Sequence, residues 1–493
     1  MMKAPSYLVV VLVTLVFSLG CDPDLGLLLP AYNSDAINTT SLTLVARIVH
    51  ITDSHVIDEE SPGRFAGGEC LVDEAWRPYE SYSTQLLDGF VRTANRIHAA
   101  GRPIDFLVHT GDACDNVQSN ELGWLLAVLD GEVIDPLSGP DDRPVETRPP
   151  PLMDPHAAFE AQGLYQTGRH GDLTSIDWYM VFGNHDVHAV GVFPIVESSS
   201  GRRTAPLPLP GRPGFVLPKV LDPVSSFAYG NITPAQPGPP AFFEFPRYVE
   251  PNLARAFFNK RECIRAMFDT EMGPIGHGYN DPETSPTWYS VSPAPGVRLI
   301  GLDTTDADWI EPAYPFSEGA ISQEQVAFLR AELDAARDRD ELVIIATHHP
   351  SVSLQIYSGS EILGPEFRAV RSEYPNVVLH LAGHLHRHRV MDRGNYVEIE
   401  TASTIDWPQE GRLIEIWRDE EGGAIVVTYE VFSHIDDVLP ALDDDPLRPM
   451  REVAQAMALN DKTAAARQRR LDPTGYDPHG YPSDRTGTII LRP

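Results

Sequence analysis

Residues 175–186 read SIDWYMVFGNHD: an apolar run typical of a buried strand reaches Gly183 and is followed by Asn184, His185 and Asp186. Alone, this ending could be a simple polar turn, because glycine and asparagine are common turn residues. The pattern recurs elsewhere in the chain, however, and the recurrence decides the fold. Four further apolar runs end in polar side chains in the same way: LVARIVHITDSH (44–55), IDFLVHTGDACD (104–115), ELVIIATHHP (341–350) and NVVLHLAGHLH (376–386).

Helical segments separate several of these runs. Residues 322–336 predict a helix that is opened by a Ser322/Gln325 capping box. Strands that are apolar throughout and alternate with helices indicate an α/β protein whose sheets are covered on both faces. From about 396 to 432 strand follows strand, which predicts antiparallel pairing near the end of the sheet. A further helix is predicted at 81–101, with six apolar residues on one face: Leu86, Leu87, Phe90, Val91, Ala94 and Ile97.

Composition limits the class of protein and its partners. The chain has 493 residues, of which 42% are hydrophobic and 22% are charged, as in ordinary soluble globular proteins. Its formal net charge of -32 argues against a nucleic-acid partner, because phosphate backbones are bound by Lys and Arg. Any anionic substrate must therefore meet a local positive centre. With four cysteines in a chain of this length, stability is expected from a core rather than from disulfides.

The N-terminal sequence MMKAPSYLVVVLVTLVFSLGC (1–21) predicts export. Its apolar run, from Tyr7 to Phe17, is shorter than the ~20 residues of a membrane-spanning helix and fits a secretory signal. SLGC (18–21) resembles the lipobox of bacterial lipoproteins, which implies lipidation of Cys21 after cleavage. The lipobox usually has Leu at the position of Ser18, so secretion without lipidation is the alternative. We expect a bacterial envelope or periplasmic protein that touches the membrane only through this anchor.

The rest of the chain divides into a tether at 22–42, one domain at 43–435, and a C-terminal helix and tail at 436–493. Polar, proline-rich insertions interrupt the domain at about 131–172 and 187–295. Proline excludes such stretches from core helices and central strands. The many aromatic residues of the second insertion favour an ordered loop over disorder. We expect this insertion to form the substrate-selecting surface.

The five polar strand endings are expected to converge. In an open α/β sheet, functional groups gather beyond the carboxyl ends of the strands. Together the endings offer carboxylate, amide and imidazole ligands, which suit Zn, Mn, Fe or Ni better than Ca. Two divalent cations ~3.5–4 Å apart also need a shared carboxylate between them. The sequence therefore predicts a site for two divalent ions.

The five endings, in their order, resemble the motifs of the calcineurin-like metallophosphoesterase superfamily: D-x-H, G-D-x-x-D, G-N-H-D/E, H-x-P and G-H-x-H. The resemblance spans residues 53–386. It implies a four-layer α/β/β/α sandwich, here with long loop insertions. It also implies ligands for a first metal ion, Asp53, His55 and His386; ligands for a second, Asn184, His348 and His384; and Asp112 as the bridge between the two.

Further roles follow from the same resemblance. His185 is expected to face the substrate beside Asn184 and to stabilise or protonate the leaving oxygen, and Asp115 to orient it. Asp115 stands where purple acid phosphatases have a metal-binding Tyr, so a Tyr-ligated ferric site is not expected. In THHP the ligand is assigned to His348, with His349 as the alternative.

Four neighbouring residues receive structural interpretations. Asp186 is interpreted as a cap of the following turn, and Cys114 as a small buried residue. His188 and His388 are expected to be solvated loop residues.

The resemblance implies a hydrolase of phosphodiesters or phosphomonoesters, with a hydroxide that bridges the metal ions as the nucleophile. The expected cofactors are two divalent ions, Mn, Fe or Zn, and the expected partner is a small phosphorylated substrate. Two other functions stay open: a metal-binding surface lipoprotein without turnover, and a hydrolase of a non-phosphate ester such as a lactone. The presence of both His185 and Asp115 favours an active enzyme.

Overall fold

The structure is a computed structural model of the whole chain. It describes residues 41–492 apart from 65–75, 140–148, 151–152, 168–172, 209–215, 226, 229–246, 307–316, 357–360, 437–438, 440–444 and 462–476. The predicted signal segment, the tether and Cys21 lie outside the described residues. Among the described helices, none combines the length and the apolar character that crossing a bilayer requires.

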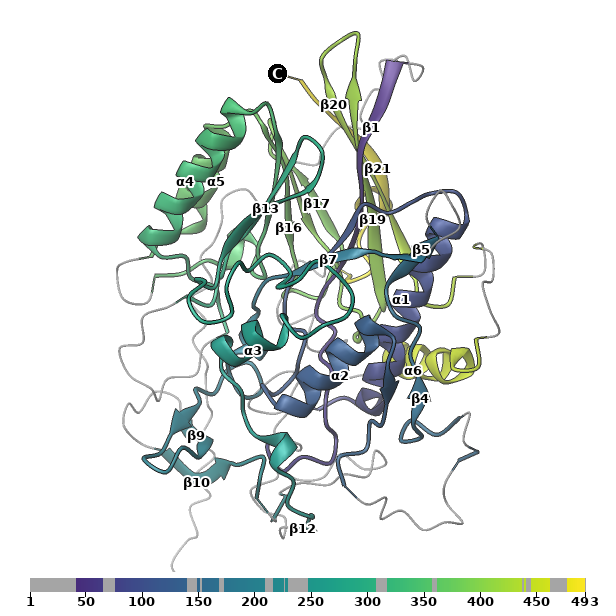
Figure 1. Cartoon of the computed structure of the whole chain (residues 1–493), viewed down its shortest axis with the longest axis vertical. Helices are drawn as coiled ribbons and strands as arrows, with labels where there is room; N and C mark the ends of the chain where they lie inside the picture. Colours follow the sequence, from purple (N-terminus) through teal and green to yellow (C-terminus); the bar gives the residue numbers. More distant parts are fainter. Residues whose placement is uncertain are drawn as a thin grey trace, which may run out of the picture.

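A first six-stranded sheet has the order β21-β20-β19-β1-β2-β7 (Figure 1). Strands β1, β2 and β7 are parallel, so their carboxyl ends point to the same edge of the sheet. Strands β19, β20 and β21 extend the sheet antiparallel on the other side of β1. The bounds are β1 Leu42–Ile51, β2 Phe106–His109, β7 Asp177–Met180, β19 Glu410–Asp419, β20 Ile425–Ser433 and β21 Thr486–Leu491.

A second six-stranded sheet has the order β13-β14-β15-β16-β18-β17. Its four central strands are parallel, and β13 and β17 pair antiparallel at the two edges. The central strands are apolar because both of their faces are buried. The bounds are β13 Tyr289–Ala294, β14 Val297–Gly301, β15 Leu342–Ala346, β16 Val377–Ala382, β17 Arg389–Asp392 and β18 Val397–Glu400.

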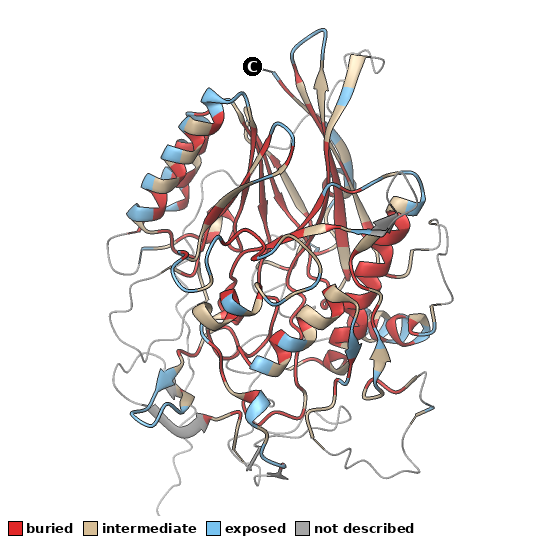
Figure 2. Ribbon diagram, in the orientation of Figure 1, coloured by how far each residue is buried: buried red, intermediate tan, exposed pale blue. Residues whose placement is uncertain are grey.

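The two sheets pack against each other, and helices cover their outer faces (Figures 1 and 2). One hydrophobic cluster contains side chains of both sheets, for example Ile48, Leu299 and Leu379. A second cluster joins the other face of the second sheet to two helices. These are α4 (Gln323–Asp338) and α5 (Gly364–Ser372); the helices on the side of the first sheet are α1 (Ser83–Ala99), α2 (Ser119–Asp130) and α6 (Arg448–Asn460).

The predicted four-layer α/β/β/α sandwich is confirmed, and the antiparallel pairing predicted after residue 396 is confirmed in part. β19 and β20 run antiparallel in the first sheet beside β1, as predicted, whereas β18 pairs parallel to β16 in the second sheet. Continuous apolar character does not distinguish these arrangements, because it reports burial and not strand direction.

Short elements occupy the insertions. Residues 289–294, counted in the second insertion, form β13 at the edge of the second sheet. The domain boundaries otherwise stay predictions, and most of the aromatic residues of 193–252 lie outside the described residues. The short elements are β3 Val133–Ile134, β4 Phe159–Glu160, β5 Tyr165–Thr167, β6 Leu173–Ser175, β8 Val196–Glu197, β9 Arg203–Pro208, β10 Val216–Leu221, β11 Phe227–Ala228, β12 Arg247–Tyr248 and α3 Lys260–Ala266.

Within the described part of the chain, five further helical segments connect the larger elements. One of them, η5, is formed by the Asn-His-Asp of the opening motif. Their bounds are η2 Glu80–Tyr82, η5 Asn184–Asp186, η7 Leu253–Arg255, η8 Ser351–Ser353 and α8 Pro482–Arg485.

Candidate metal centre

The five polar endings follow β1, β2, β7, β15 and β16, and hydrogen bonds join them into one site. The backbone N–H of His384 donates to the Asp53 carboxylate at 3.1 Å, which joins the second sheet to the first. The Nδ1 of His348 donates to the carbonyl oxygen of Thr110 at 2.8 Å, which makes a second link. The carboxyl ends of the strands in the two sheets therefore lie next to each other, and they bring together residues more than 300 positions apart, such as Asp53 and His384.

The three ligands predicted for the first metal ion meet in a tight group. Asp53, His55 and His386 each offer one ligand atom within 4.8 Å of the others. The Nε2 atoms of His55 and His386 are 3.3 Å apart, and the Nε2 of His386 is 3.2 Å from Oδ1 of Asp53. All three side chains are buried, as ligands of an internal ion would be.

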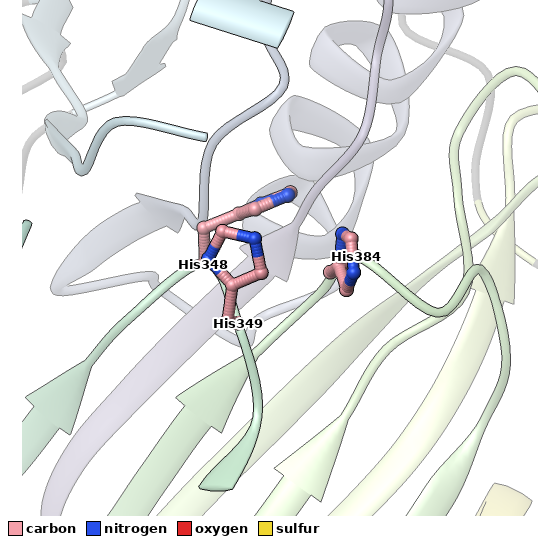
Figure 3. A group of neighbouring side chains, drawn as sticks. All are labelled: His348, His349 and His384. Carbon is pink, nitrogen blue, oxygen red and sulfur yellow. The ribbon is translucent and has the colours of Figure 1, made fainter. Parts of the chain in front are cut away.

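The ligands predicted for the second ion lie next to this group. The Nε2 of His348 is 3.0 Å from Oδ1 of Asn184 and 3.1 Å from Oδ2 of Asp112. Figure 3 shows His384 facing His348 and His349, and the three form a second candidate group. Asp112 is grouped with Asp53 and His348, and also with His55, so it lies where the predicted bridge must be.

Three of the predicted ligand histidines are held in place by a hydrogen bond from Nδ1, the ring nitrogen opposite Nε2, to a protein oxygen. The Nδ1 of His55 donates to Asp115 Oδ1 at 2.9 Å, and the Nδ1 of His386 donates to Asp406 Oδ2 at 2.8 Å. His348 is held by the Thr110 carbonyl. A metal-binding histidine usually makes such a bond with its second nitrogen, which fixes the tautomer and leaves Nε2 for the ion.

This donor set fits cations. Because the Nδ1 atoms of His55 and His386 donate to carboxylates, their two Nε2 atoms present lone pairs to each other across 3.3 Å. In the neutral ring of His348, whose Nδ1 proton is donated to Thr110, the lone pair of Nε2 likewise faces the Asp112 carboxylate and the Asn184 amide oxygen. Acceptors that face acceptors in a buried site repel unless a positive charge lies among them. Imidazole and carboxylate ligands suit Zn, Mn or Fe.

The electrostatic field of the site also favours positive charge. Burial favours the neutral ring of His348, but the Asp112 and Asp53 carboxylates raise the pKa of His348 to about 9. Burial opposes ionisation of Asp112, yet His348 and His185 hold the pKa of this carboxyl well below its usual range. The same negative field that stabilises a proton on His348 would stabilise a metal cation.

The backbone at the ligands adopts a conformation that L-residues rarely take. Of the ten non-glycine residues with positive φ in the described part of the chain, five are predicted ligands. Such conformations cost about 1–3 kcal/mol each and cluster at functional sites. Their concentration at the polar strand endings supports the prediction that these loops form a functional site. The five are Asp53 (52°), His55 (40°), Asp112 (50°), His384 (69°) and His386 (49°).

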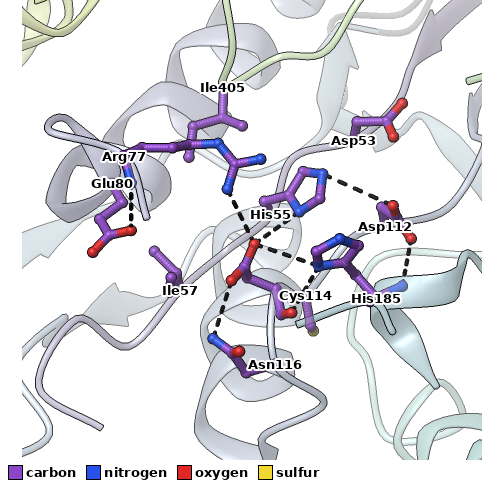
Figure 4. Close-up of polar contacts among 12 residues, drawn as sticks. Asp53, His55, Ile57, Arg77, Glu80, Asp112, Cys114, Asn116, His185 and Ile405 are labelled. Atoms are coloured by element: carbon purple, nitrogen blue, oxygen red, sulfur yellow. Dashed lines mark hydrogen bonds and ion pairs between the residues drawn. The ribbon is translucent and has the colours of Figure 1, made fainter. Parts of the chain in front are cut away.

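His185 lies beside the ligands, but its contact with Asp115 differs from the expected one. Its Nδ1 donates to the backbone carbonyl of Asp115 at 2.9 Å, whereas the Asp115 carboxylate is 3.5 Å away (Figure 4). The short bond of that carboxylate goes to His55. Asp115 therefore orients His55, a predicted metal ligand, with its side chain, and His185 mainly with its backbone.

Asp186 is structural, but it does not cap the following turn. Its carboxylate accepts from the backbone N–H groups of Ala113, Cys114 and Gly183, at 2.9, 3.0 and 2.9 Å. It thus ties the loop after β2 to the loop after β7 and places Asp112 next to His185. Cys114 is buried in the main hydrophobic cluster, as predicted.

The structure favours His348 over His349 as a ligand. His349 lies near His384, but its Nδ1 accepts from Thr304 and its Nε2 donates to the Ser317 carbonyl, both at 2.7 Å. Both of its ring nitrogens therefore have protein partners. The prediction that His188 and His388 are solvated was wrong, since both are buried. The Nε2 of His388 donates to Glu410 at 3.1 Å.

The sequence analysis did not identify two residues behind the candidate ligands: Asp406, which contacts His386, and Arg77, which contacts Asp115 and Asp406. Asp406 follows β18 in TASTID (401–406), so it belongs to a sixth strand with a polar ending, and that signal could have revealed it. Arg77 lies between a segment outside the described residues and α1, and no local pattern distinguishes it.

The fold and the donor set define a metal-binding α/β sandwich. Residues 46–221 match the family described as calcineurin-like phosphoesterase. This match includes the first three of the five motifs and confirms the predicted resemblance for this region of the chain. No curated protein matches the sequence.

Several solved structures are similar at low identity. A dimetal phosphatase from Danio rerio is 14% identical with a TM-score of 0.42, covering 80% of this chain and 98% of its own. A Thermus thermophilus sulfate thiohydrolase is 11% identical with a TM-score of 0.35, covering 85% and 61%. A putative 5'-nucleotidase from Staphylococcus aureus is 13% identical with a TM-score of 0.33, covering 83% and 58%. This chain thus spans about three fifths of the latter two proteins, and likeness this low transfers no substrate.

Proposed function

We propose that the protein is a hydrolase of phosphate esters, phosphodiesters or phosphomonoesters, that depends on two divalent metal ions. The observation that carries the proposal is the position of His185. It lies within one group with His55 and Asp112, which are predicted ligands, and it is fixed by two hydrogen bonds. A site that only stored metal would have no use for an oriented imidazole beside its ligands.

Seven side chains would hold the ions, with Asp112 shared between the two positions. Mn, Fe or Zn bound there would supply positive charge for the phosphate oxygens and a water activated for attack on phosphorus. Such a local positive centre also accounts for phosphate binding by a chain of net charge -32.

His185 would act on the leaving group. Because a carbonyl oxygen only accepts, the bond to Asp115 requires the proton on Nδ1 of His185. The backbone N–H of His185 donates to Asp112 Oδ1 at 2.8 Å, which fixes its position relative to the bridging carboxylate. The remaining nitrogen, Nε2, can carry a proton to the leaving oxygen. A general acid held in this way accelerates bond cleavage by about 10²–10⁴-fold.

The test is a substrate panel for the purified protein loaded with manganese. Aryl phosphodiesters, aryl phosphomonoesters and a set of lactones would be compared at matched concentrations, with and without chelator. We expect metal-dependent hydrolysis of one phosphate class. Turnover of lactones alone would assign a non-phosphate ester as substrate, and binding of two ions without any turnover would indicate a metal-binding lipoprotein.

For the location, we propose a bacterial envelope protein that is anchored through Cys21. The support is the N-terminal sequence, an apolar run followed by SLGC. A small phosphorylated substrate outside the inner membrane fits this location, and the acidic composition argues against nucleic acid as the partner.

A further inference from the structure

One buried guanidinium connects the two carboxylates that orient the first group of metal ligands. Arg77 is almost completely buried. Its Nε donates to Asp406 Oδ1 at 2.9 Å and its Nη2 to Asp406 Oδ2 at 3.0 Å, a bidentate pair. Its Nη1 donates to Asp115 Oδ1 at 3.2 Å (Figure 4). A single planar group therefore fixes two carboxylates from different parts of the fold.

Each of these carboxylates holds the ring of a different ligand. Asp115 Oδ1, which accepts from Arg77, also accepts from Nδ1 of His55 at 2.9 Å. Asp406 Oδ2 accepts from Nδ1 of His386 at 2.8 Å. The chain His55–Asp115–Arg77–Asp406–His386 therefore closes a ring of contacts behind the two Nε2 atoms, which are 3.3 Å apart.

The arrangement is asymmetric between the two predicted metal positions. At the second position, Nδ1 of His348 is held by the Thr110 backbone carbonyl and not by a side-chain carboxylate. Tyr79 strengthens the first arrangement, because its hydroxyl donates to Asp406 Oδ1 at 2.6 Å. A buried ion pair contributes little net stability by itself, since desolvation offsets the attraction. A positioning role explains the placement of this charge better than stability does.

We propose that Arg77 is a positioning residue that sets the metal affinity of the first position, formed by Asp53, His55 and His386, by fixing the two imidazole rings relative to each other. The inference rests on the proposed two-metal function. Loss of an outer partner of a metal-binding histidine lowers affinity by about 10–100-fold. Arg77 supports two such partners, so its loss should weaken the first position selectively.

The test is calorimetric titration of the metal-free protein with Mn²⁺, which reads affinity and stoichiometry without activity. Wild type should bind two ions. Arg77→Met should bind one ion with wild-type affinity and the other about 10-fold or more weakly. In a His348→Ala background, which leaves the first position, Arg77→Met should weaken the remaining ion by the same factor. Arg451→Met is the matched control, since Arg451 is also fully buried and pairs with Asp445 in another part of the fold.

Arg77→Lys distinguishes the effect of the guanidinium contacts from the effect of the positive charge and from a loss of folding. Lysine keeps the positive charge but cannot make the bidentate and bridging contacts. Affinity for the first ion should therefore fall in this variant as well, with an unchanged circular dichroism spectrum. Unchanged affinities for both ions in Arg77→Lys, or in a folded Arg77→Met, would overturn the inference and leave the two-metal function intact. Failure of the wild type to bind two ions would instead remove the proposed function on which the inference rests.

Discussion

At the scale of single residues, His185 has one orientation because both of its contacts are short. Its backbone N–H is bound to Asp112 and its Nδ1 to the Asp115 carbonyl, at 2.8 and 2.9 Å. The ring also packs edge-on against His55, with centroids 4.4 Å apart. These contacts leave a single atom, Nε2, for proton transfer.

Replacement of His185 by alanine should therefore slow hydrolysis in a way that depends on the leaving group. Esters of poorly acidic alcohols need the proton and should lose about 10²–10⁴-fold in kcat. Esters of acidic nitrophenols should lose much less, because their oxygen leaves as an anion. The check is a series of leaving groups measured with wild type and His185→Ala. An equal loss across the series, with both ions still bound, would contradict the proton-donor role.

Glu410 connects the C-terminal segment to the site and predicts a dependence of stability on pH. Burial disfavours its carboxylate, but hydrogen bonds from His388 and Arg485 outweigh this and lower the pKa of Glu410 from 4.5 to about 2. A lowered pKa stabilises the fold above pH 4.5, and the contribution disappears as the pH falls toward 2.

Glu410→Gln should accordingly lower the free energy of unfolding by about 2–3 kcal/mol near neutral pH. The difference from wild type should shrink as the pH falls below about 4.5, measured by chemical denaturation over a pH series. Glu373→Gln is the matched control, because Glu373 makes a similar paired contact with Arg330 but is exposed. That variant should stay within about 0.5 kcal/mol of wild type. A Glu410 effect that does not change with pH would refute the argument.

The convergence of the candidate ligands could be predicted from the sequence because each follows an apolar run that ends at the same edge of a sheet. The individual ligand assignments of His55, Asp112 and His386 rest on the motif resemblance and stay predictions. Arg77 could not be predicted, because its role depends on Asp115 and Asp406, 38 and 329 positions away. The partner of the Asp115 carboxylate was missed for a related reason. The resemblance assigned the Asp115 carboxylate to His185, and the sequence carries no signal that it reaches His55 instead.

At the scale of elements, the loops after β2 and β7 approach each other so closely that only glycine fits at Gly183. A Cβ at this position would collide with Oδ1 and the backbone N of Asp112. The φ of Gly183 is -103°, which any residue can adopt, so the requirement is one of space and not of backbone conformation. The glycine of GNHD therefore allows the bridging carboxylate to sit against the turn that carries Asn184 and His185.

Gly183→Ala should displace Asp112 and weaken binding of both ions, with a loss of about 1–3 kcal/mol of stability from overpacking. Gly123→Ala is the control within the same protein. Gly123 lies on the exposed face of α2, and nothing lies within 4 Å of an added Cβ. Alanine at position 123 should raise the free energy of unfolding by about 0.5–1 kcal/mol and leave the affinity for both metal ions unchanged. Calorimetric metal titration and thermal unfolding of both variants make the comparison, and two bound ions of normal affinity in Gly183→Ala would contradict it.

Element types could be predicted better than element pairing. Helix α1 buries the six apolar residues of its predicted face, and α4 begins at the predicted Ser322 cap. The placement of β19 and β20 next to β1 could not be predicted, because register and sheet membership depend on contacts over more than 360 residues, such as Ile48 with Ile414.

At the scale of the whole molecule, the acidic chain places its predicted cationic centre where the two sheets meet. A formal charge of -32 would repel phosphate esters from a uniform surface. Metal ions held at the carboxyl ends of both sheets would make the electrostatic potential positive at the site, so that a phosphate ester is attracted there. We propose that the predicted signal and Cys21 at the N-terminus direct the protein to the cell envelope.

Cys21→Ser should release the protein from membranes if the cysteine carries the lipid. The lipid on Cys21 is the only membrane attachment that the sequence predicts for the mature protein. The variant should therefore move to the soluble fraction after cell lysis and lose labelling by a fatty-acid analogue. A variant with intact signal cleavage that stays on the membrane would count against the anchor. If the wild-type protein is already in the soluble fraction, the protein is secreted without a lipid.

The central claim is that seven side chains from the ends of five strands hold two ions on either side of Asp112. Anomalous diffraction from crystals grown with Mn²⁺ tests it most directly. We predict two manganese peaks about 3.5–4 Å apart, one beside Asp53, His55 and His386 and the other beside Asn184, His348 and His384. A site without manganese at saturating metal, or a single ion that Asp112 does not contact, would contradict the account.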